Sequence, residues 1–129
     1  MTKVCSLDFS DGYVRLLSAS SPVARKCHQC RECRRGIAAG ERYHVERYVW
    51  EGRMHTHRTC AHCKAARRWL EDRCGGFAYG DVREDVVEHA RNVGRNFALM
   101  RAAVGMLRKW RAPSGRLLPP PVLQEERQQ

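Results

Sequence analysis

The chain has few large apolar side chains and no long hydrophobic run. Val, Leu, Ile and Phe together account for only 24 of the 129 residues, and Ile occurs once. So few apolar side chains cannot build a large core, and a small chain then needs another source of folding energy. No apolar run approaches the roughly 20 residues of a membrane span, so we expect no membrane association.

Acidic residues are also few relative to basic ones. The chain has 24 Lys and Arg against 14 Asp and Glu, a formal net charge of +10. An excess of this size favours anionic partners, nucleic acid before others. The alternative is a solvated arginine-rich surface with no anionic partner.

Seven cysteines are present, and their spacing favours a metal over disulfides. The number is odd and no apolar signal segment is visible, so a cytoplasmic location is expected. Cys30 and Cys33 form one C-x2-C pair, and Cys60 and Cys63 form a second. Two such pairs supply the four ligands of a tetrahedral structural zinc site, so we predict one zinc ion per chain.

The ligand set leaves two alternatives open. Cys27 forms an overlapping C-x2-C pair with Cys30 and is a reserve ligand, although Gly36 just after Cys33 favours the later pair because it permits a tight turn. His57 could replace Cys63 in a Cys-Cys-His-Cys set. Otherwise His55 and His57 are expected on the solvated face of a strand.

The predicted fold class is a small zinc-stabilised α+β protein built on a treble-clef zinc finger. Strands near 43–49 and 54–58 form a hairpin between the cysteine pairs, and a helix over 60–73 carries the last two ligands in its first turn. In this helix Lys64, Arg67 and Arg68 are expected to point mostly outward. The predicted regions are an N-terminal hairpin with its Asp11-Gly12 turn and linker (1–23), the zinc module (24–80), a long helix (81–111) and an extended Pro-rich tail (112–129).

The predicted long helix has an apolar seam whose steps alternate between four and three residues. Its members are Val82, Val86, Ala90, Val93, Phe97, Met100, Val104, Leu107 and Trp110. A bend or break is expected near Gly94 or Gly105. This seam exceeds what a small zinc module can cover, so we predict a homodimer through antiparallel pairing of residues 82–110.

Residues 30–89 resemble a group of small zinc-finger proteins of bacteriophages and prophages. The matching stretches are 32–35, 40–43, 50–52, 59–63 and 79–80, with Glu84, Asp85, Glu88 and His89. The resemblance implies a treble-clef zinc site with the two outer cysteine pairs, and a bacterial host cytoplasm. The alternative set with His57 resembles the zinc fingers of poly(ADP-ribose) polymerases.

The expected function is non-enzymatic binding of nucleic acid through arginine-rich surfaces. The candidate residues are Arg31, Arg34, Arg35, Lys64, Arg67, Arg68, Arg101, Arg108 and Lys109. The alternative is an adaptor or inhibitor, a phage-type host modulator that binds an acidic protein partner while zinc is purely structural. An HNH-like nuclease is a lesser alternative, because neither an Asp-His dipeptide nor an Asn occurs between Cys33 and Cys63.

Overall fold

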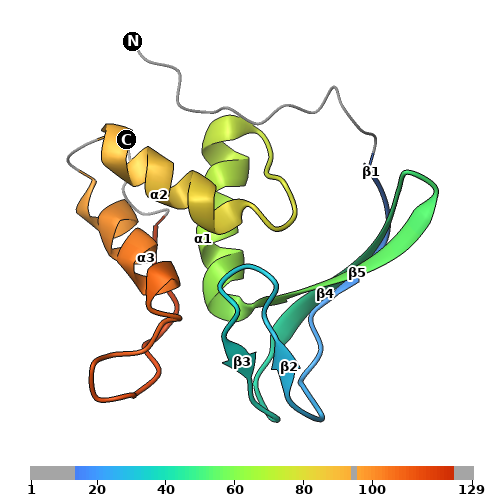
Figure 1. The fold of residues 1–129 in the computed structure, drawn as a ribbon, viewed down its shortest axis with the longest axis horizontal. Helices are drawn as coiled ribbons and strands as arrows, with labels where there is room; N and C mark the ends of the chain where they lie inside the picture. The colour runs from blue at the N-terminus through green and yellow to red at the C-terminus, as the bar shows by residue number, and fades with distance from the viewer. Residues whose placement is uncertain (1–13, 94–95, 124–129) are drawn as a thin grey trace.

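The structure is a computed structural model that describes residues 14–93 and 96–123, and over these it is a small α+β fold (Figure 1). A three-stranded antiparallel sheet has the order β1 (Val14–Ser20), β4 (Tyr43–Trp50), β5 (Arg53–Cys60). A second, two-stranded sheet pairs β2 (His28–Gln29) with β3 (Gly36–Ile37). Three helices follow, α1 (Ala61–Cys74), α2 (Val82–Val93) and α3 (Phe97–Leu107). None of the described helices is both long and apolar enough to cross a membrane.

The β4–β5 hairpin leads directly into α1. Trp50 pairs with Arg53, and the intervening Glu51 and Gly52 both have positive φ, 53° and 76°. Two such residues form the tight turn whose twist matches the flanking strands. At the other end of β5, the Cys60 side chain accepts a hydrogen bond from the Cys63 amide and caps α1. The strand end and the first helical turn therefore bring two cysteines close together.

The N-terminal part of the chain adds an edge strand to this hairpin. β1 pairs with β4, from Val14 opposite Trp50 to Ser20 opposite Val45, and all its residues are exposed. Residues 18–20, which the composition suggested were linker, belong to this strand, so that prediction is wrong. The Asp11-Gly12 turn and the first strand of the predicted hairpin lie outside the described residues.

The helix predicted for 81–111 is two helices. α2 ends at Val93 and α3 begins at Phe97, where Asn96 caps it by accepting a hydrogen bond from the Leu99 amide at 3.0 Å. The two helices contact one another and α2 also contacts α1. Val82 and Val86 of the seam are buried, whereas Phe97, Met100, Val104 and Leu107 are exposed. The bounds of one element over 81–111 are therefore wrong, whereas the break expected near Gly94 is confirmed, and Val82 and Val86 of the seam are covered within the chain.

The chain after α3 returns toward α1. The Trp110 carbonyl accepts a hydrogen bond from the Leu118 amide, and Arg111 bridges to Leu117. Trp110 and Leu123 are both buried in the core that α1, α2 and α3 share. Part of the predicted tail is thus packed against the fold.

Candidate metal centre

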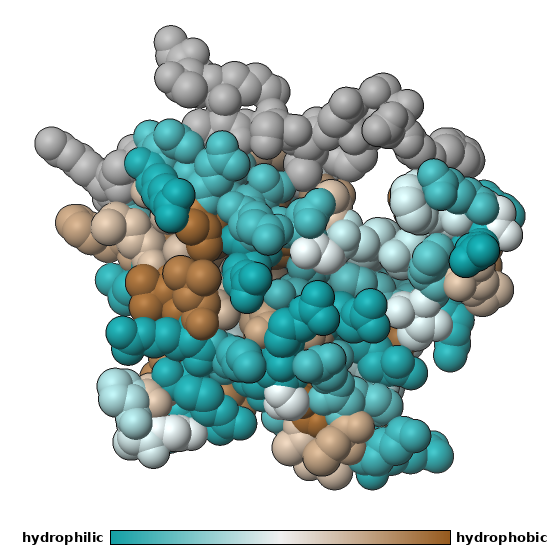
Figure 2. Space-filling view, viewed as in Figure 1, coloured by the Kyte–Doolittle hydropathy of each residue, from teal (hydrophilic) through white to brown (hydrophobic). Residues whose placement is uncertain are grey.

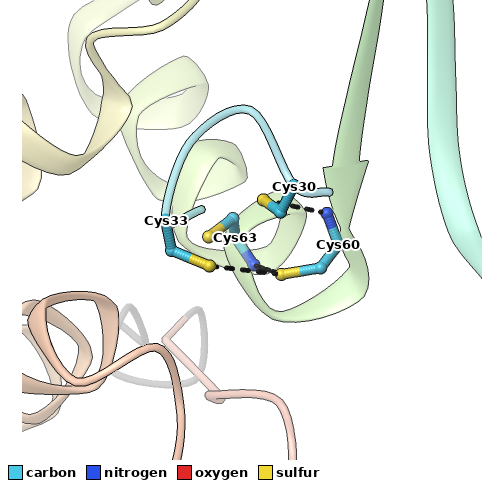
Figure 3. Close-up of side chains that lie close together, drawn as sticks. All are labelled: Cys30, Cys33, Cys60 and Cys63. Carbon is cyan, nitrogen blue, oxygen red and sulfur yellow. Dashed lines mark hydrogen bonds between the residues drawn. The ribbon is translucent and has the colours of Figure 1, made fainter. Parts of the chain in front are cut away.

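The two cysteine pairs converge on one buried point (Figure 3). Cys30 and Cys33 lie in the turn between β2 and β3, Cys60 ends β5, and Cys63 lies in the first turn of α1. All four residues are fully buried, and their sulfur atoms lie within 4.8 Å of one another. A tetrahedral ion with metal–sulfur bonds of about 2.3 Å requires sulfur separations of about 3.8 Å, close to the 4.0 Å between Cys33 and Cys60. The four residues therefore fit a single metal ion.

Hydrogen-bond donors surround the sulfur atoms. The Cys30 sulfur accepts from the amides of Glu32 at 3.4 Å and Cys60 at 3.3 Å, and the Cys60 sulfur accepts from the Cys63 amide at 3.4 Å. The Trp110 indole N–H lies 3.3 Å from the Cys63 sulfur. Such donors stabilise negative charge on sulfur and orient the ligands. The first pair is followed by a positive φ of 71° at Arg34 rather than at Gly36, so the predicted place of the tight turn was wrong by two residues.

The four thiols strongly perturb one another. Contact with Cys33 holds the pKa of Cys30 far below its ordinary range, whereas contact with Cys30 raises the pKa of Cys63 well above it. Four thiolates at this separation repel one another, so the sulfurs alone cannot all ionise. A divalent cation at their centre would remove this conflict, because metal-bound thiols are deprotonated.

Neither reserve ligand joins the four cysteines. Cys27 is exposed. His57 is buried, and its Nε2 lies 2.8 Å from Oε2 of Glu32. The set with His57 in place of Cys63 is therefore not assembled, and the expectation that His57 lies on a solvated face was wrong.

Glu32 links the first cysteine pair to the start of α2. Its side chain is fully buried, and besides contacting His57 it accepts hydrogen bonds from the amides of Gly80 at 2.9 Å and Val82 at 3.1 Å. A carboxylate at a helix N-terminus satisfies amides that have no partner within the helix. Glu32 therefore ties the second helix to the metal-site loop. It lies between two predicted ligands, but nothing in the local pattern identified this role.

A second buried ion pair joins α1 to the sheet. Arg67 donates two hydrogen bonds to Glu46, at 2.7 and 3.1 Å, and Tyr79 donates to the same carboxylate at 3.2 Å. The Arg67 guanidinium also lies 4.0 Å from the centre of the Phe77 ring. Arg67 was expected to point outward, so this prediction was wrong.

A third pair lies beside the cysteines. Arg35 is buried and donates to both carboxylate oxygens of Glu41 at 3.0 Å, which holds the pKa of Glu41 below its usual range. Its guanidinium also lies 3.4 Å from Nδ1 of His62, whose Nε2 contacts the Leu118 carbonyl. Arg35 and Arg67 were both candidates for contacting nucleic acid, and in this fold both are buried.

The other candidate binding residues remain on the surface but on separate elements. Arg31 and Arg34 are exposed in the β2–β3 turn, and Arg68 is exposed on α1. Lys64 is half-buried, which lowers its pKa. Three further candidates are exposed on α3 or just after it: Arg101, Arg108 and Lys109.

Comparison of the chain with protein-family models, with curated proteins and with solved structures gives no match.

Proposed function

We propose that Cys30, Cys33, Cys60 and Cys63 hold one structural zinc ion and that residues 28–74 form a treble clef around it. The order of elements supports this: a cysteine pair in the β2–β3 turn, the β4–β5 hairpin, and a helix with the last two ligands at its start. An all-sulfur, closed and buried ligand set is typical of structural zinc. The resemblance to phage zinc-finger proteins is consistent with the same ligands.

On this scaffold we propose non-enzymatic binding of nucleic acid. The observation that carries the proposal is that most acidic residues in 14–60 are buried or paired within the fold. Of the four, Glu32 and Glu46 are buried in internal pairs and Glu41 is paired with Arg35, which leaves Glu51 as the one exposed acid. Eight basic residues of the same stretch are exposed: Arg15, Arg25, Lys26, Arg31, Arg34, Arg42, Arg47 and Arg53. The basic surface is thus left without compensating acids, as contacts with phosphate require.

Aromatic rings on the outer part of the sheet suggest how bases would be held. Tyr48 already stacks on His55 and on Tyr79, with ring centres 5.1 and 4.2 Å away. Trp50, which is 38% exposed and 6.0 Å from His55, is the ring most open to a base. Rings on a basic surface hold unpaired bases by stacking, which tolerates any sequence. Burial raises the pKa of Tyr48, an effect partly offset by the charge of Arg31 nearby.

The histidines of the fold support a binding role over catalysis. His57 and His62 are buried with partners, and Nδ1 of His44 lies 3.0 Å from the Ser21 hydroxyl. These three histidines are therefore held by neighbouring groups of the fold. A metal-dependent nuclease is accordingly not proposed.

The test is the salt dependence of binding to fluorescent single-stranded DNA and RNA, measured by anisotropy. We expect affinity to fall steeply with added salt, and to fall at least tenfold in a variant with both Arg31→Gln and Arg53→Gln. The matched control carries Arg91→Gln and Arg116→Gln, which removes the same charge from exposed positions outside the sheet. Absence of binding at low salt would refute the proposal, as would equal losses in the two variants.

Protein binding is a second candidate function, favoured by a specific observation. The described surface carries an apolar groove along α3 that phosphate contacts do not explain.

A further inference from the structure

The exposed face of α3 is a continuous apolar row. Phe97, Met100, Val104 and Leu107 follow at steps of three and four residues and are 66%, 41%, 49% and 57% exposed. Side chains at this spacing lie on one face of a helix. Figure 2 shows hydrophobic side chains gathered over α3. The opposite face of the helix, with Leu99, Ala102 and Met106, fills the core, so α3 is apolar on both sides.

Phe97, Met100 and Val104 of this row form one wall of a groove, and Leu107 continues the row beyond it. The groove has a volume of about 470 Å³, and its second wall is the segment after α3, with Ala112, Pro113 and Leu118. From Phe97 to Leu107 the row extends about 15 Å at 1.5 Å per residue. That length suits about three turns of a partner helix, which would bury its own apolar face here.

The charge around the groove selects the partner. Arg101, Arg108 and Arg111 line it, and no described lining residue is acidic. Residues 96–123 contain five basic residues and no acidic one. A basic rim around an apolar floor attracts a segment with apolar anchors and flanking carboxylates. Nucleic acid fits the rim but not the floor, which offers apolar side chains instead of polar partners.

A second copy of this chain fits less well. A two-fold contact through α3 would place the arginine rim of one copy against that of the other, and like charges would meet. The predicted antiparallel dimer relied on Asp85 and Glu88 of a continuous helix facing Arg101 and Arg108. Here Asp85 is buried and α2 packs on α3 of the same chain.

We infer that the groove between α3 and residues 111–118 binds an acidic amphipathic helix of a partner protein. The groove is also joined to the metal centre. Gly105 lines it, and a Cβ added there would lie 2.3 Å from the Trp110 ring, whose N–H contacts the Cys63 sulfur. Leu118 lines it as well, and its carbonyl contacts His62. The groove and the cysteine cluster therefore share Trp110 and the segment that carries Leu118.

The test presents the full-length chain with two displayed libraries of 14-residue amphipathic helices. The two share varied apolar positions, but the flanking positions are Asp and Glu in one and Lys and Arg in the other. We expect enrichment of the acidic library alone, and selected peptides should lose at least tenfold in affinity with Val104→Glu or Arg108→Glu. Val104 and Arg108 are exposed, so both variants should fold, which circular dichroism checks. Leu16→Glu, at an exposed apolar position on β1, is the matched control and should bind as the wild type does.

Three results would overturn the inference. One is failure of the acidic library to enrich over the basic one. Another is equal affinity in the wild type and Val104→Glu. The third is a concentration-dependent dimer in sedimentation that Val104→Glu dissolves, which would assign the groove to a second copy. Since this surface lies away from the sheet, loss of single-stranded nucleic-acid binding in the Arg31 and Arg53 variant leaves this test unaffected.

Discussion

The sheet with α1 and the pair α2–α3 are stabilised in different ways. In the sheet region the buried side chains include two polar pairs, Glu32 with His57 and Glu46 with Arg67, and four cysteines. In the α2–α3 region the buried side chains are mostly apolar, with Leu99 and Met106 at the centre. The first region therefore relies on polar partners and on the cysteine cluster as well as on apolar contacts, and the second relies mainly on apolar packing.

The two regions also differ in the side chains that they expose to solvent. The sheet region pairs its acids internally and leaves basic groups and aromatic rings outside. The helical region has an apolar row left over after its core is filled. Each region thus exposes the residues that remain once its internal pairs and contacts are made: basic and aromatic groups on the sheet, apolar groups on α3. This division accounts for two distinct proposed binding surfaces on one small chain.

Loss of a cysteine ligand is expected to have the largest effect. Cys60→Ser removes one of four ligands, and metal binding energies of about 10–16 kcal/mol in zinc-finger peptides exceed the stability of most small domains. We expect loss of cooperative unfolding in calorimetry. Cys27→Ser, at an exposed cysteine outside the cluster, is the control and should unfold as the wild type does. A normal transition in Cys60→Ser would count against the metal's structural role.

Breaking the buried pair on α1 should have the next largest effect. Glu46→Gln leaves the buried Arg67 charge with only the partly exposed Glu71, 3.5 Å from its Nε, which should cost about 3 kcal/mol in urea unfolding. Replacing both residues, with Glu46→Leu and Arg67→Met, should recover much of the loss because no unpaired charge remains. If Glu46→Gln alone is neutral, the pair does not hold α1 on the sheet.

Gly105→Ala tests the contact between the helical region and the metal centre. The added methyl group would overlap the Trp110 ring at 2.3 Å, and displacing that ring removes the N–H donor to Cys63. Overpacking of this kind costs about 1–3 kcal/mol. Gly36→Ala is the control, since its added Cβ meets nothing within 4 Å and its φ is not positive. Equal melting temperatures for the two variants would contradict the account.

Asp85 gives the smallest expected effect and one that depends on pH. Burial raises its pKa, and Oδ2 has no hydrogen-bond partner in the described structure. Because the folded pKa lies above the unfolded value of about 3.9, the free energy of unfolding falls as pH rises through the folded pKa. Asp85→Asn should remove this pH dependence and raise the free energy of unfolding at pH 7 by at most about 1 kcal/mol. The increase is small because the N-terminus of α2 stabilises the ionised Asp85 carboxylate and so offsets part of the cost of its burial. Urea titrations of both proteins at pH 4 and pH 7 measure the free energy of unfolding. A wild type that is more stable than Asp85→Asn at pH 7 would contradict the predicted direction.

The cysteine cluster could be predicted because its signal is local spacing, and both pairs lie together as expected. The burial of Glu46, His57 and Arg67 could not be predicted, because alternation in a strand and amphipathic spacing in a helix both assign polar residues to solvent. Their partners lie 21 to 25 residues away in the chain, where no local pattern connects them. Periodicity likewise could not separate one long helix from two, since both keep the same apolar steps, although the glycine at 94 indicated where a break would come.

Native mass spectrometry of the full chain, before and after treatment with a zinc chelator, tests the central claim most directly. We predict one zinc ion per chain before treatment. Its removal should shift the charge-state distribution to that of an unfolded protein, because the few apolar side chains buried in the sheet region, such as Ile37, Ala66 and Leu70, are too few to replace the metal. A compact metal-free chain with an unchanged distribution would contradict the account.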